Sequence, residues 1–349
     1  MTIYRYDLQT QAVYSELVER LQLAEIQELA EQEGSFVRRL VKGNPYWYLR
    51  RRIGTRINER YVGAETPQLL DQIETLKAQS TEAKGAAKGR RDLIRKLRSD
   101  GYLMTDRRIG RVIEELARAG VFRLNGVLVG THAFRCYSAL LGIRLQHEFA
   151  DTGDVDIAKD SSISLGIHES TDPTIGDALA KAERFVEIPD LNPKNPSTGW
   201  QTTDQALRVD VLTPLTGKPR EGFVELPAFG AHATALRFLD FLLVETVRAA
   251  VLTGSGVLVR IPTPERYALH KLIVAQRRAA TSRDKSKKDI AQAETLIEAL
   301  LEDRPDDLLD AWSDLLGRGK KWKTEAMKSV RVLPERFRDV LTGKVELNP

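Results

Sequence analysis

Three short segments in the middle of the chain each place polar residues suited to phosphate or metal chemistry among apolar neighbours. They are residues 128–133 (LVGTHA), 153–158 (GDVDIA) and 207–212 (LRVDVL). In the first, an apolar run ends at Gly130-Thr131 and a helical pattern follows, so free backbone N–H groups and the positive end of a helix dipole meet at the turn. Glycine lets a phosphate approach the backbone closely. The pattern predicts a phosphate site at Gly130 and Thr131, with a plain N-cap role for Thr131 as the alternative.

The second segment carries two aspartates, Asp154 and Asp156, that alternate with apolar residues. In a β-strand this spacing puts both carboxylates on one face, about 7 Å apart. Two like charges that close repel each other unless a cation or solvent separates them. Mg²⁺ prefers a few carboxylates together with substrate phosphates, so this pair can hold one or two Mg²⁺ (or Mn²⁺) ions. The alternative is an edge strand with a solvated acidic face.

A third aspartate, Asp210, shares a strand face with Arg208 in the third segment. If this strand pairs with the strand of Asp154 and Asp156, the three carboxylates meet, because facing side chains of paired strands lie about 5 Å apart. Aspartate is disfavoured inside strands, so three aspartates in two apolar strands need a reason, and a metal site supplies one. The alternative is a surface ion pair between Arg208 and Asp210.

The pattern of strands and helices expected around these segments predicts an α+β fold with a mixed β-sheet and flanking helices. Strands are expected at residues 121–129, 154–158, 184–188, 207–212 and 257–261, and a proline-containing loop at 190–203.

The two ends of the chain differ from this middle part. The N-terminal part predicts a helix, a small three-stranded β-ribbon within residues 36–63 and helical sequence over residues 66–98. From Thr263-Pro264, a good helix start, the pattern is helical nearly to the end. We therefore expect three domains: a basic N-terminal module at 1–100, a catalytic domain at 101–261 and a helical C-terminal domain at 262–349.

Composition places the chain among ordinary globular proteins. Of its 349 residues 42% are hydrophobic and 29% charged, and the formal net charge is +4. The single cysteine, Cys136, excludes a disulfide framework and a zinc ribbon. The most apolar stretch, residues 238–259, contains charged residues and two glycines, so we expect a buried helix followed by a strand rather than a membrane span. These features are typical of a cytoplasmic protein without membrane association.

The middle segments together resemble the polymerase-β-type nucleotidyltransferase superfamily, in which a Gly-Thr or Gly-Ser turn opens a helix, D-x-D follows on a strand, and a third aspartate lies on a later strand. The sequences LVGTHAFRCYSALLG, TGDVDIA, RVDVLTP and VRIPTPERYALHKLIVAQRR are similar to a bacterial branch of it. The resemblance covers roughly residues 106–289. The 53 residues between Asp156 and Asp210 form a longer gap than in the smallest members.

The resemblance implies a role for each matching residue. Gly130 and Thr131 would hold the β- and γ-phosphates of an NTP. Asp154 and Asp156 would bind the metal ions that bridge the triphosphate, and Asp210 would hold the catalytic metal and help to deprotonate the acceptor hydroxyl. On the helix after Thr263, Lys271 is a candidate phosphate ligand, with a solvated lysine as the alternative. Lys288, in the charged run at 283–289, is a weaker candidate of the same kind.

The N-terminal ribbon suggests a second surface. Residues 36–63 contain eight lysines or arginines against one acid, Glu59, and aromatic residues are interleaved with them. Stacking surfaces combined with positive charge favour nucleic-acid binding, and the ribbon looks like the small arm domain with which some tyrosine recombinases bind DNA. The alternative is a ribbon whose aromatics pack on neighbouring helices. The candidate nucleic-acid-binding residues are Tyr46, Trp47, Tyr48, Arg50, Arg51, Arg52 and Arg56.

These readings predict an enzyme that transfers a nucleoside monophosphate from an NTP to a hydroxyl of an acceptor, with the C-terminal helices closing over the nucleotide. RNA, such as tRNA, is the preferred acceptor, because the basic module needs a polyanionic partner. A tRNA-modifying toxin with a neutralising partner protein is one form of this hypothesis. Two alternatives stay open: transfer of AMP to a protein or a small-molecule alcohol, and a non-catalytic nucleic-acid-binding protein.

Overall fold

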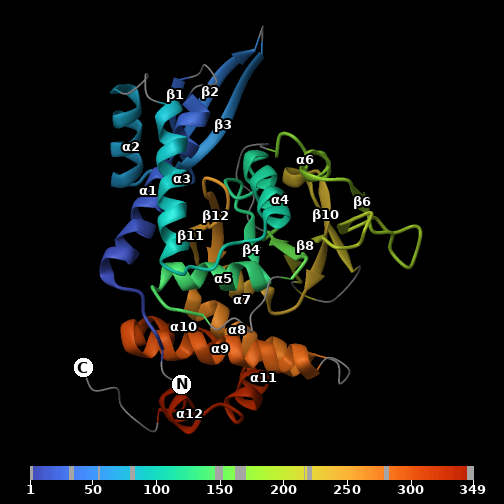
Figure 1. Ribbon diagram of the computed structural model, residues 1–349. Coiled ribbons are helices and arrows are strands. Elements are labelled where there is room, and N and C mark those ends of the chain that lie inside the picture. The colour runs from blue at the N-terminus through green and yellow to red at the C-terminus, as the bar shows by residue number, and fades with distance from the viewer. Residues whose placement is uncertain are drawn as a thin grey trace.

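The fold is taken from a computed structural model. It describes residues 3–30, 35–53, 56–78, 83–145, 152–161, 170–215, 217, 222–278 and 283–343, and the side chains at 27–30, 35, 51–53, 56–58, 76–78 and 83–85 lie outside the description. Figure 1 shows three layers, with the N-terminal elements above a central sheet and the last helices below it. None of the described helices combines the length and the apolar character needed to cross a membrane.

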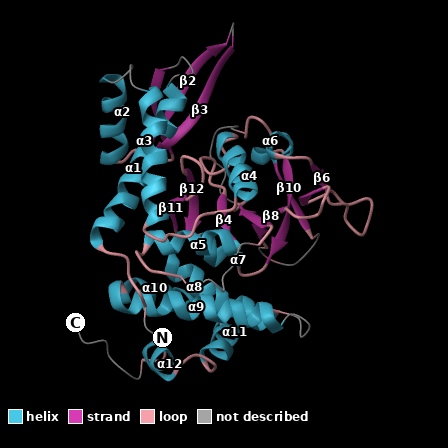
Figure 2. Cartoon of the chain, viewed as in Figure 1, coloured by secondary structure: helices cyan, strands magenta, loops and turns pink. Residues whose placement is uncertain are grey.

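The N-terminal module consists of helices around a three-stranded antiparallel ribbon, as Figure 2 shows. Helix α1 (Leu8–Ala30) precedes β1 (Ser35–Val41), β2 (Asn44–Ile53) and β3 (Arg56–Ala64). The helical stretch predicted for residues 66–98 forms two helices, α2 (Pro67–Ala78) and α3 (Ala83–Ser99). The prediction of one helix and a small ribbon is therefore confirmed for this part of the chain.

A seven-stranded mixed sheet forms the centre of the molecule, and its strand order is β4-β5-β8-β10-β9, with β7 also paired to β8 and β6 paired to β7. The middle strands β5 (Asp154–Ala158) and β8 (Arg208–Pro214) are parallel. Their apolar residues are buried while the alternate residues are less so, which is the pattern of a strand buried mainly on one face. The remaining strands are β4 (Val127–Val129), β6 (Phe185–Glu187), β7 (Gly199–Thr202), β9 (Phe223–Leu226) and β10 (Ala231–Leu236).

Two sequence-based expectations are wrong in detail. Residues 121–125 are turns rather than the start of a strand, because Gly120 and Asn125 both have positive φ. The loop expected at 190–203 ends in β7. The buried helix and following strand expected within 238–259 are confirmed: a short helix, α7 (Leu239–Leu243), precedes the two-stranded antiparallel sheet of β11 (Thr246–Val251) and β12 (Val257–Pro262).

Helices cover the sheet and fill the C-terminal part. Those around the sheet are α4 (Arg107–Arg118), α5 (Gly130–Leu140), α6 (Ile175–Ala182) and the 3-10 turn η1 (Pro227–Phe229). The C-terminal helices are α8 (Pro264–Arg277), α9 (Arg283–Asp303), α10 (Pro305–Gly317), α11 (Lys320–Val330) and α12 (Glu335–Leu341). One hydrophobic cluster runs from Ile109 to Leu341, so the sheet and the C-terminal helices share a core across the domain boundary predicted at 261/262.

The N-terminal module is joined to the sheet by a second hydrophobic cluster. Leu17 of α1 and Leu97 of α3 are fully buried in it together with Ala250, Leu252 and Leu258 of the β11–β12 sheet. Within this contact the buried hydroxyl of Tyr14 accepts a hydrogen bond of 3.0 Å from the backbone N–H of Ala250. Helix α1 therefore closes the outer edge of β11 instead of leaving its N–H group without a partner.

We predict that Tyr14→Phe destabilises the protein by about 1–3 kcal/mol, because the buried Ala250 N–H loses its partner. Urea unfolding followed by tryptophan fluorescence measures the change. Tyr4→Phe is the matched control, since the Tyr4 side chain is 70% exposed and its variant should unfold as the wild type does. Equal midpoints for Tyr14→Phe and wild type would contradict the role assigned to this hydrogen bond.

Candidate active site

The paired central strands bring the three predicted aspartates together. In the parallel register of β5 and β8, Asp156 faces Asp210 and Asp154 faces Arg208. Residues opposite each other in a ladder point to the same face of a sheet, so the three carboxylates and the guanidinium share one face. The partnership of Asp210, which the long gap in sequence left open, is therefore built into the strand register.

Asp156 lies at the centre of this group. Burial, together with the charges of Asp210 and Asp154, raises the pKa of Asp156 to about 6, although Lys271 and Arg208 act in the opposite direction. The site thus concentrates negative charge at a place where water cannot disperse it. Such a carboxylate group is stabilised by a cation.

Two glycines make room for these carboxylates. Gly130 has a φ of +68°, and a Cβ atom built on it would lie 2.3 Å from Oδ2 of Asp156. Gly199 on β7 faces Asp210 from the other side of β8, and a Cβ atom there would lie 2.5 Å from Oδ1 of Asp210. A side chain at either position would therefore displace the facing carboxylate, and Gly130 additionally has the left-handed backbone that glycine adopts without strain.

Helix α5 begins directly at Gly130 and has no side-chain cap at its start. Its first backbone N–H groups are consequently available for an external acceptor, and Gly130 and Thr131 line the cavity in front of the aspartates. The turn is held from the opposite side, because the Tyr267 hydroxyl on α8 donates a hydrogen bond of 2.8 Å to the Gly130 carbonyl oxygen.

The facing wall of the cavity is basic and comes from α8 and α9. Lys271 Nζ donates to Oδ1 of Asp289 at 2.7 Å, and Arg278 Nε donates to Oδ2 of the same carboxylate at 2.8 Å. Asp289 is 2% exposed and Lys271 is 9% exposed, so the alternative of a solvated Lys271 is wrong. Burial lowers the pKa of Lys288, and the charge of Lys271 lowers it further, which places both ammonium groups in one cluster.

The cavity between the two walls has a volume of about 490 Å³, within the usual range for small-molecule sites. Carboxylates form one side of it and ammonium and guanidinium groups the other. Its lining residues are Gly130, Thr131, Thr152, Asp154, Asp156, Arg208, Asp210, Lys271, Arg278, Lys285, Lys288, Asp289 and Gln292. The structure thus brings together all seven residues predicted for the catalytic and nucleotide-binding site.

Arg208 lies within the group of carboxylates at which a divalent cation would bind. Its guanidinium donates to both carboxylate oxygens of Asp210, at 2.7 and 2.9 Å, so the ion pair considered as an alternative exists within the carboxylate group. Among the described residues, no three His, Cys, Asp or Glu side chains are arranged to hold a metal ion as they stand. The chemistry of the donor set is suitable for Mg²⁺ or Mn²⁺, because Asp154, Asp156 and Asp210 offer hard carboxylate oxygens on one sheet face.

The structure describes the side chains of four of the seven ribbon residues predicted to bind nucleic acid, and one of them, Tyr48, is buried against the expectation. Tyr48 is 2% exposed and packs edge-on against Tyr61, so it offers no face for stacking. Trp47 packs beside the small core between α1 and α2 and donates from Nε1 to Glu65 at 3.0 Å. Arg50 pairs with Glu59 at 2.8 Å. Tyr46 is half-buried, whereas the side chains of Arg51, Arg52 and Arg56 lie outside the described part of the structure.

Several cavity residues were missed by the sequence analysis. Asp289 and Arg278 form ion pairs across two helices, and no spacing in the sequence distinguishes them from ordinary charged residues. No sequence spacing marks Tyr267 either, because its hydrogen-bond partner, the Gly130 carbonyl oxygen, is 137 residues away in the chain. Arg208 carries a visible signal, since it alternates with Asp210 on one strand and shares its face.

Family models and a solved structure match parts of this chain. Residues 107–317 match the model of a family described as nucleotidyltransferase, and residues 11–73 match a domain of unknown function, DUF6788. Among solved structures, the chain is similar to an antigenic nucleotidyltransferase-like protein from Paracoccidioides brasiliensis, with 13% identity and a TM-score of 0.31 over 62% of this chain and 91% of that one. No curated protein gives a significant match.

We predict that Asp156→Asn stabilises the metal-free protein at pH 8. The folded-state pKa of about 6 lies above the ordinary value of 3.8, so the ionised carboxyl costs stability as the pH rises through that window. Two pKa units correspond to about 3 kcal/mol, and partial exposure reduces our expectation to about 2 kcal/mol.

Urea unfolding in the presence of EDTA at pH 8 and at pH 4 measures this effect, which should nearly vanish at the lower pH. Asp154→Asn serves as the control, because the exposed Asp154 side chain should give a smaller gain. A variant that is less stable than wild type at pH 8 would disprove the electrostatic account of Asp156.

Proposed function

Because the chain belongs to the nucleotidyltransferase family, whose model matches more than half of its length, we propose that it transfers a nucleoside monophosphate from an NTP to a hydroxyl group of RNA. The observation that carries the proposal is the division of the cavity into an acidic and a basic wall. An NTP with a divalent cation has the complementary arrangement, since the cation needs carboxylates and the triphosphate needs donors and positive charge.

The basic wall would bind the triphosphate. Lys271 and Lys288 supply ammonium groups, and the start of α5 at Gly130 and Thr131 supplies backbone N–H groups. Asp289 acts as a positioning residue, because its buried carboxylate fixes Lys271 and Arg278 at the cavity wall before the nucleotide arrives. This preset geometry favours one orientation of the nucleotide, with the α-phosphate toward the aspartates.

The acidic wall would hold Mg²⁺ or Mn²⁺ through Asp154, Asp156 and Asp210. When bound, the metal supplies charge neutralisation of the attacking and leaving oxygens. Asp210 would accept a hydrogen bond from the acceptor hydroxyl and take part in its deprotonation. The bond from the acceptor oxygen to the α-phosphorus forms as the bond to the pyrophosphate oxygen breaks, and pyrophosphate leaves along the basic wall.

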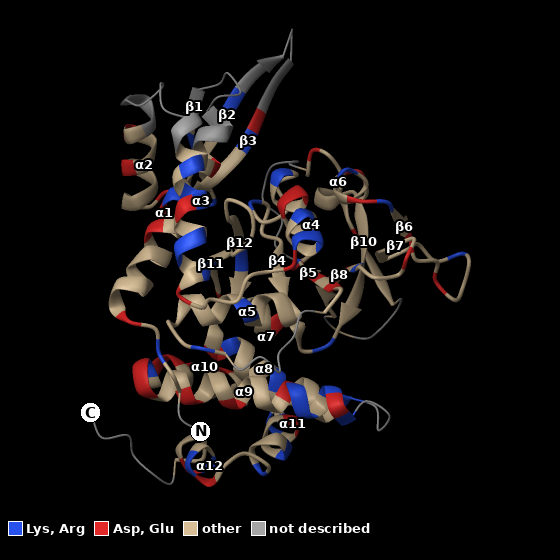
Figure 3. Ribbon diagram, in the orientation of Figure 1, with Lys and Arg blue, Asp and Glu red and all other residues tan. Residues whose placement is uncertain are grey.

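A basic stripe on α3 supports RNA as the acceptor. Lys88, Arg91, Arg95 and Arg98 are spaced by three, four and three residues, so they follow one side of the helix, next to the face of the buried Ile94 and Leu97. Figure 3 shows this basic character along α3. Lys88, Arg91 and Arg98 are exposed, and no described residue pairs with their side chains.

The stripe leads toward the cavity. From its Arg98 end the chain continues to Met104, whose carbonyl oxygen accepts a hydrogen bond of 2.7 Å from Arg135 of α5. The charge of Arg135 in turn acts on Lys288 in the cavity wall. These contacts connect the end of α3 to the helix that begins at the proposed nucleotide site, so we expect a polyanion bound along α3 to extend toward that site.

We predict that Asp154→Ala lowers nucleotidyl transfer at least about 100-fold, because one metal-binding carboxylate is lost. The purified protein is incubated with Mg²⁺, total RNA and each NTP labelled at the α-phosphate, and RNA, protein and small molecules are separated afterwards. Asp71→Ala on α2 is the control, since this exposed aspartate lies in the N-terminal module rather than in the cavity.

Label in RNA that depends on Asp154 would support the whole proposal. Label that enters protein or a small molecule instead would keep the transfer chemistry and reject RNA as the acceptor. Absence of label from every fraction, with Mg²⁺ and with Mn²⁺, would overturn the proposed activity.

We predict that replacing Lys88, Arg91 and Arg98 by glutamate weakens RNA binding. The slope of log K against log salt concentration should also become shallower by about 2–3. The control variant reverses Lys320, Lys323 and Arg331, which lie on or just after α11 in the lowest layer of the molecule. Fluorescence anisotropy at several salt concentrations measures both. Equal slopes for the two variants would exclude α3 as the RNA-binding surface.

A further inference from the structure

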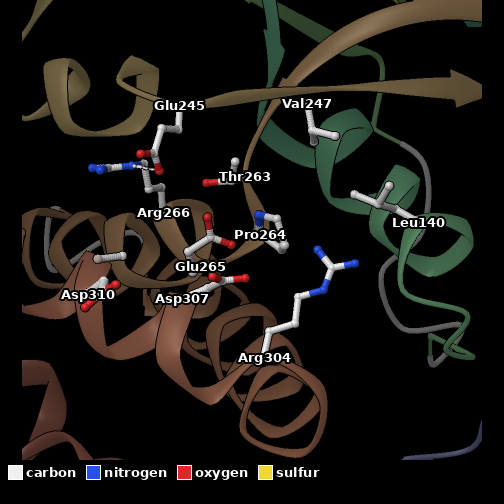
Figure 4. Close-up of a pocket in the computed structure, with 11 residues that line it drawn as sticks. Leu140, Glu245, Val247, Thr263, Pro264, Glu265, Arg266, Arg304, Asp307 and Asp310 are labelled. Atoms are coloured by element: carbon white, nitrogen blue, oxygen red, sulfur yellow. Dashed lines mark hydrogen bonds and ion pairs between the residues drawn. The ribbon is translucent and has the colours of Figure 1, made fainter. Parts of the chain in front are cut away.

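A second cavity lies at the other ends of α5 and α8, two of the helices that line the active site. It has a volume of about 320 Å³ and forms between the end of α5, the start of β11, the start of α8 and the first turns of α10 (Figure 4). Its lining shares no residue with the cavity of the aspartates. It consists of Leu140, Glu245, Val247, Thr263, Pro264, Glu265, Arg266, Arg304, Asp307, Asp310 and Ala311.

The carboxylate of Glu265 is the central feature of this cavity. The residue is 7% exposed, and no lysine or arginine among the described residues pairs with it. Burial raises the pKa of Glu265, the Thr263 hydroxyl lowers it, and the charges of Asp307 and Glu245 raise it again. Neutral donors and the first turn of α8 stabilise this carboxylate in part, and a positive charge that enters the cavity would stabilise it further against its two acidic neighbours.

Helix α10 presents a matching row of polar groups. Arg304, Asp307 and Asp310 are spaced by three residues, so they face the cavity together. Figure 4 shows Asp307 beside Glu265, with Arg304 on the side of Leu140. No described residue forms a hydrogen bond or ion pair with the Arg304 guanidinium.

The remaining arginine does not neutralise this acidic group. Arg266 is 7% exposed and donates to Glu245 at 3.0 Å and to Asp314 at 2.7 Å, so its charge is already matched by two carboxylates. Four carboxylates line the cavity against two guanidiniums, one of which is committed in this way. The cavity therefore has an excess of negative charge around a small volume with apolar walls at Leu140, Val247 and Pro264.

We propose that this cavity binds the alkylammonium group of a small molecule, held by Glu265 and Asp307. An ammonium group donates three hydrogen bonds and carries the charge that the buried carboxylate lacks. The methylene groups next to it would contact Leu140 and Val247. The same chemistry occurs in a bare polyamine and in a basic amino acid, and the unpaired Arg304 distinguishes them, because only an amino acid brings a carboxylate for it.

The test measures binding of putrescine and of ornithine to the full chain by calorimetry. Buffers contain EDTA, no NTP and constant ionic strength, so the result is independent of the proposed transfer activity. Glu265→Gln should weaken binding of the preferred probe about tenfold or more, because a charged hydrogen bond is lost in a buried site. Asp307→Asn should weaken it in the same direction, and it keeps the test valid if the buried Glu265 variant does not fold.

Asp306→Asn is the matched control. Asp306 lies in the same helical turn and carries the same charge but does not line the cavity, so binding should stay within about twofold of wild type. Tighter binding of ornithine, lost in Arg304→Ala, would support the amino-acid form, and tighter binding of putrescine would support the polyamine form. Binding of neither probe, or binding that the Glu265 and Asp307 variants leave unchanged, would overturn the proposal.

Discussion

The repulsion between aspartates on two neighbouring strands is the constraint around which the central part of the molecule is organised. Asp156 and Asp210 face each other in the β5–β8 register, and Asp154 lies on the same face. A sheet does not tolerate such a group without compensation, since like charges opposite each other are destabilising. Two neighbouring positions, Gly130 at the start of α5 and Gly199 on β7, carry no side chain, and Arg208 supplies a local counter-charge to Asp210.

The basic wall has the opposite difficulty, because it brings several positive charges together. Several cations on α8 and α9 would repel one another, and the buried carboxylate of Asp289 holds two of them in place. Each wall thus contains one residue of opposite sign, Arg208 among the carboxylates and Asp289 among the cations. A ligand that carries both a cation and phosphates has to displace only Arg208 from its carboxylate. Asp289 lies behind Lys271 and Arg278 and stays paired with them.

The sequence predicted the parts of the site that depend on local patterns. Alternation with apolar residues placed Asp154, Asp156 and Asp210 on strand faces, and the Gly-Thr turn marked the start of α5. It did not predict Asp289 or Tyr267, whose partners are distant in the chain and are selected by the packing of α8 against α9 and α5. In the ribbon, the sequence pattern suggested that Tyr48 contacts nucleic acid. Aromatic residues between arginines have the same pattern when they pack on another side chain, as Tyr48 does on Tyr61.

The bond between Tyr267 and the Gly130 turn has a consequence for how a nucleotide enters. The helix that carries Lys271 is tied to the turn that begins α5, and both belong to the core that continues into the last helices. A hinge between the sheet and the C-terminal helices would have to break this bond and open that core. The two walls are therefore held in a fixed relative position, and we expect the selectivity of the proposed nucleotide site to depend on the shape of this preorganised cavity.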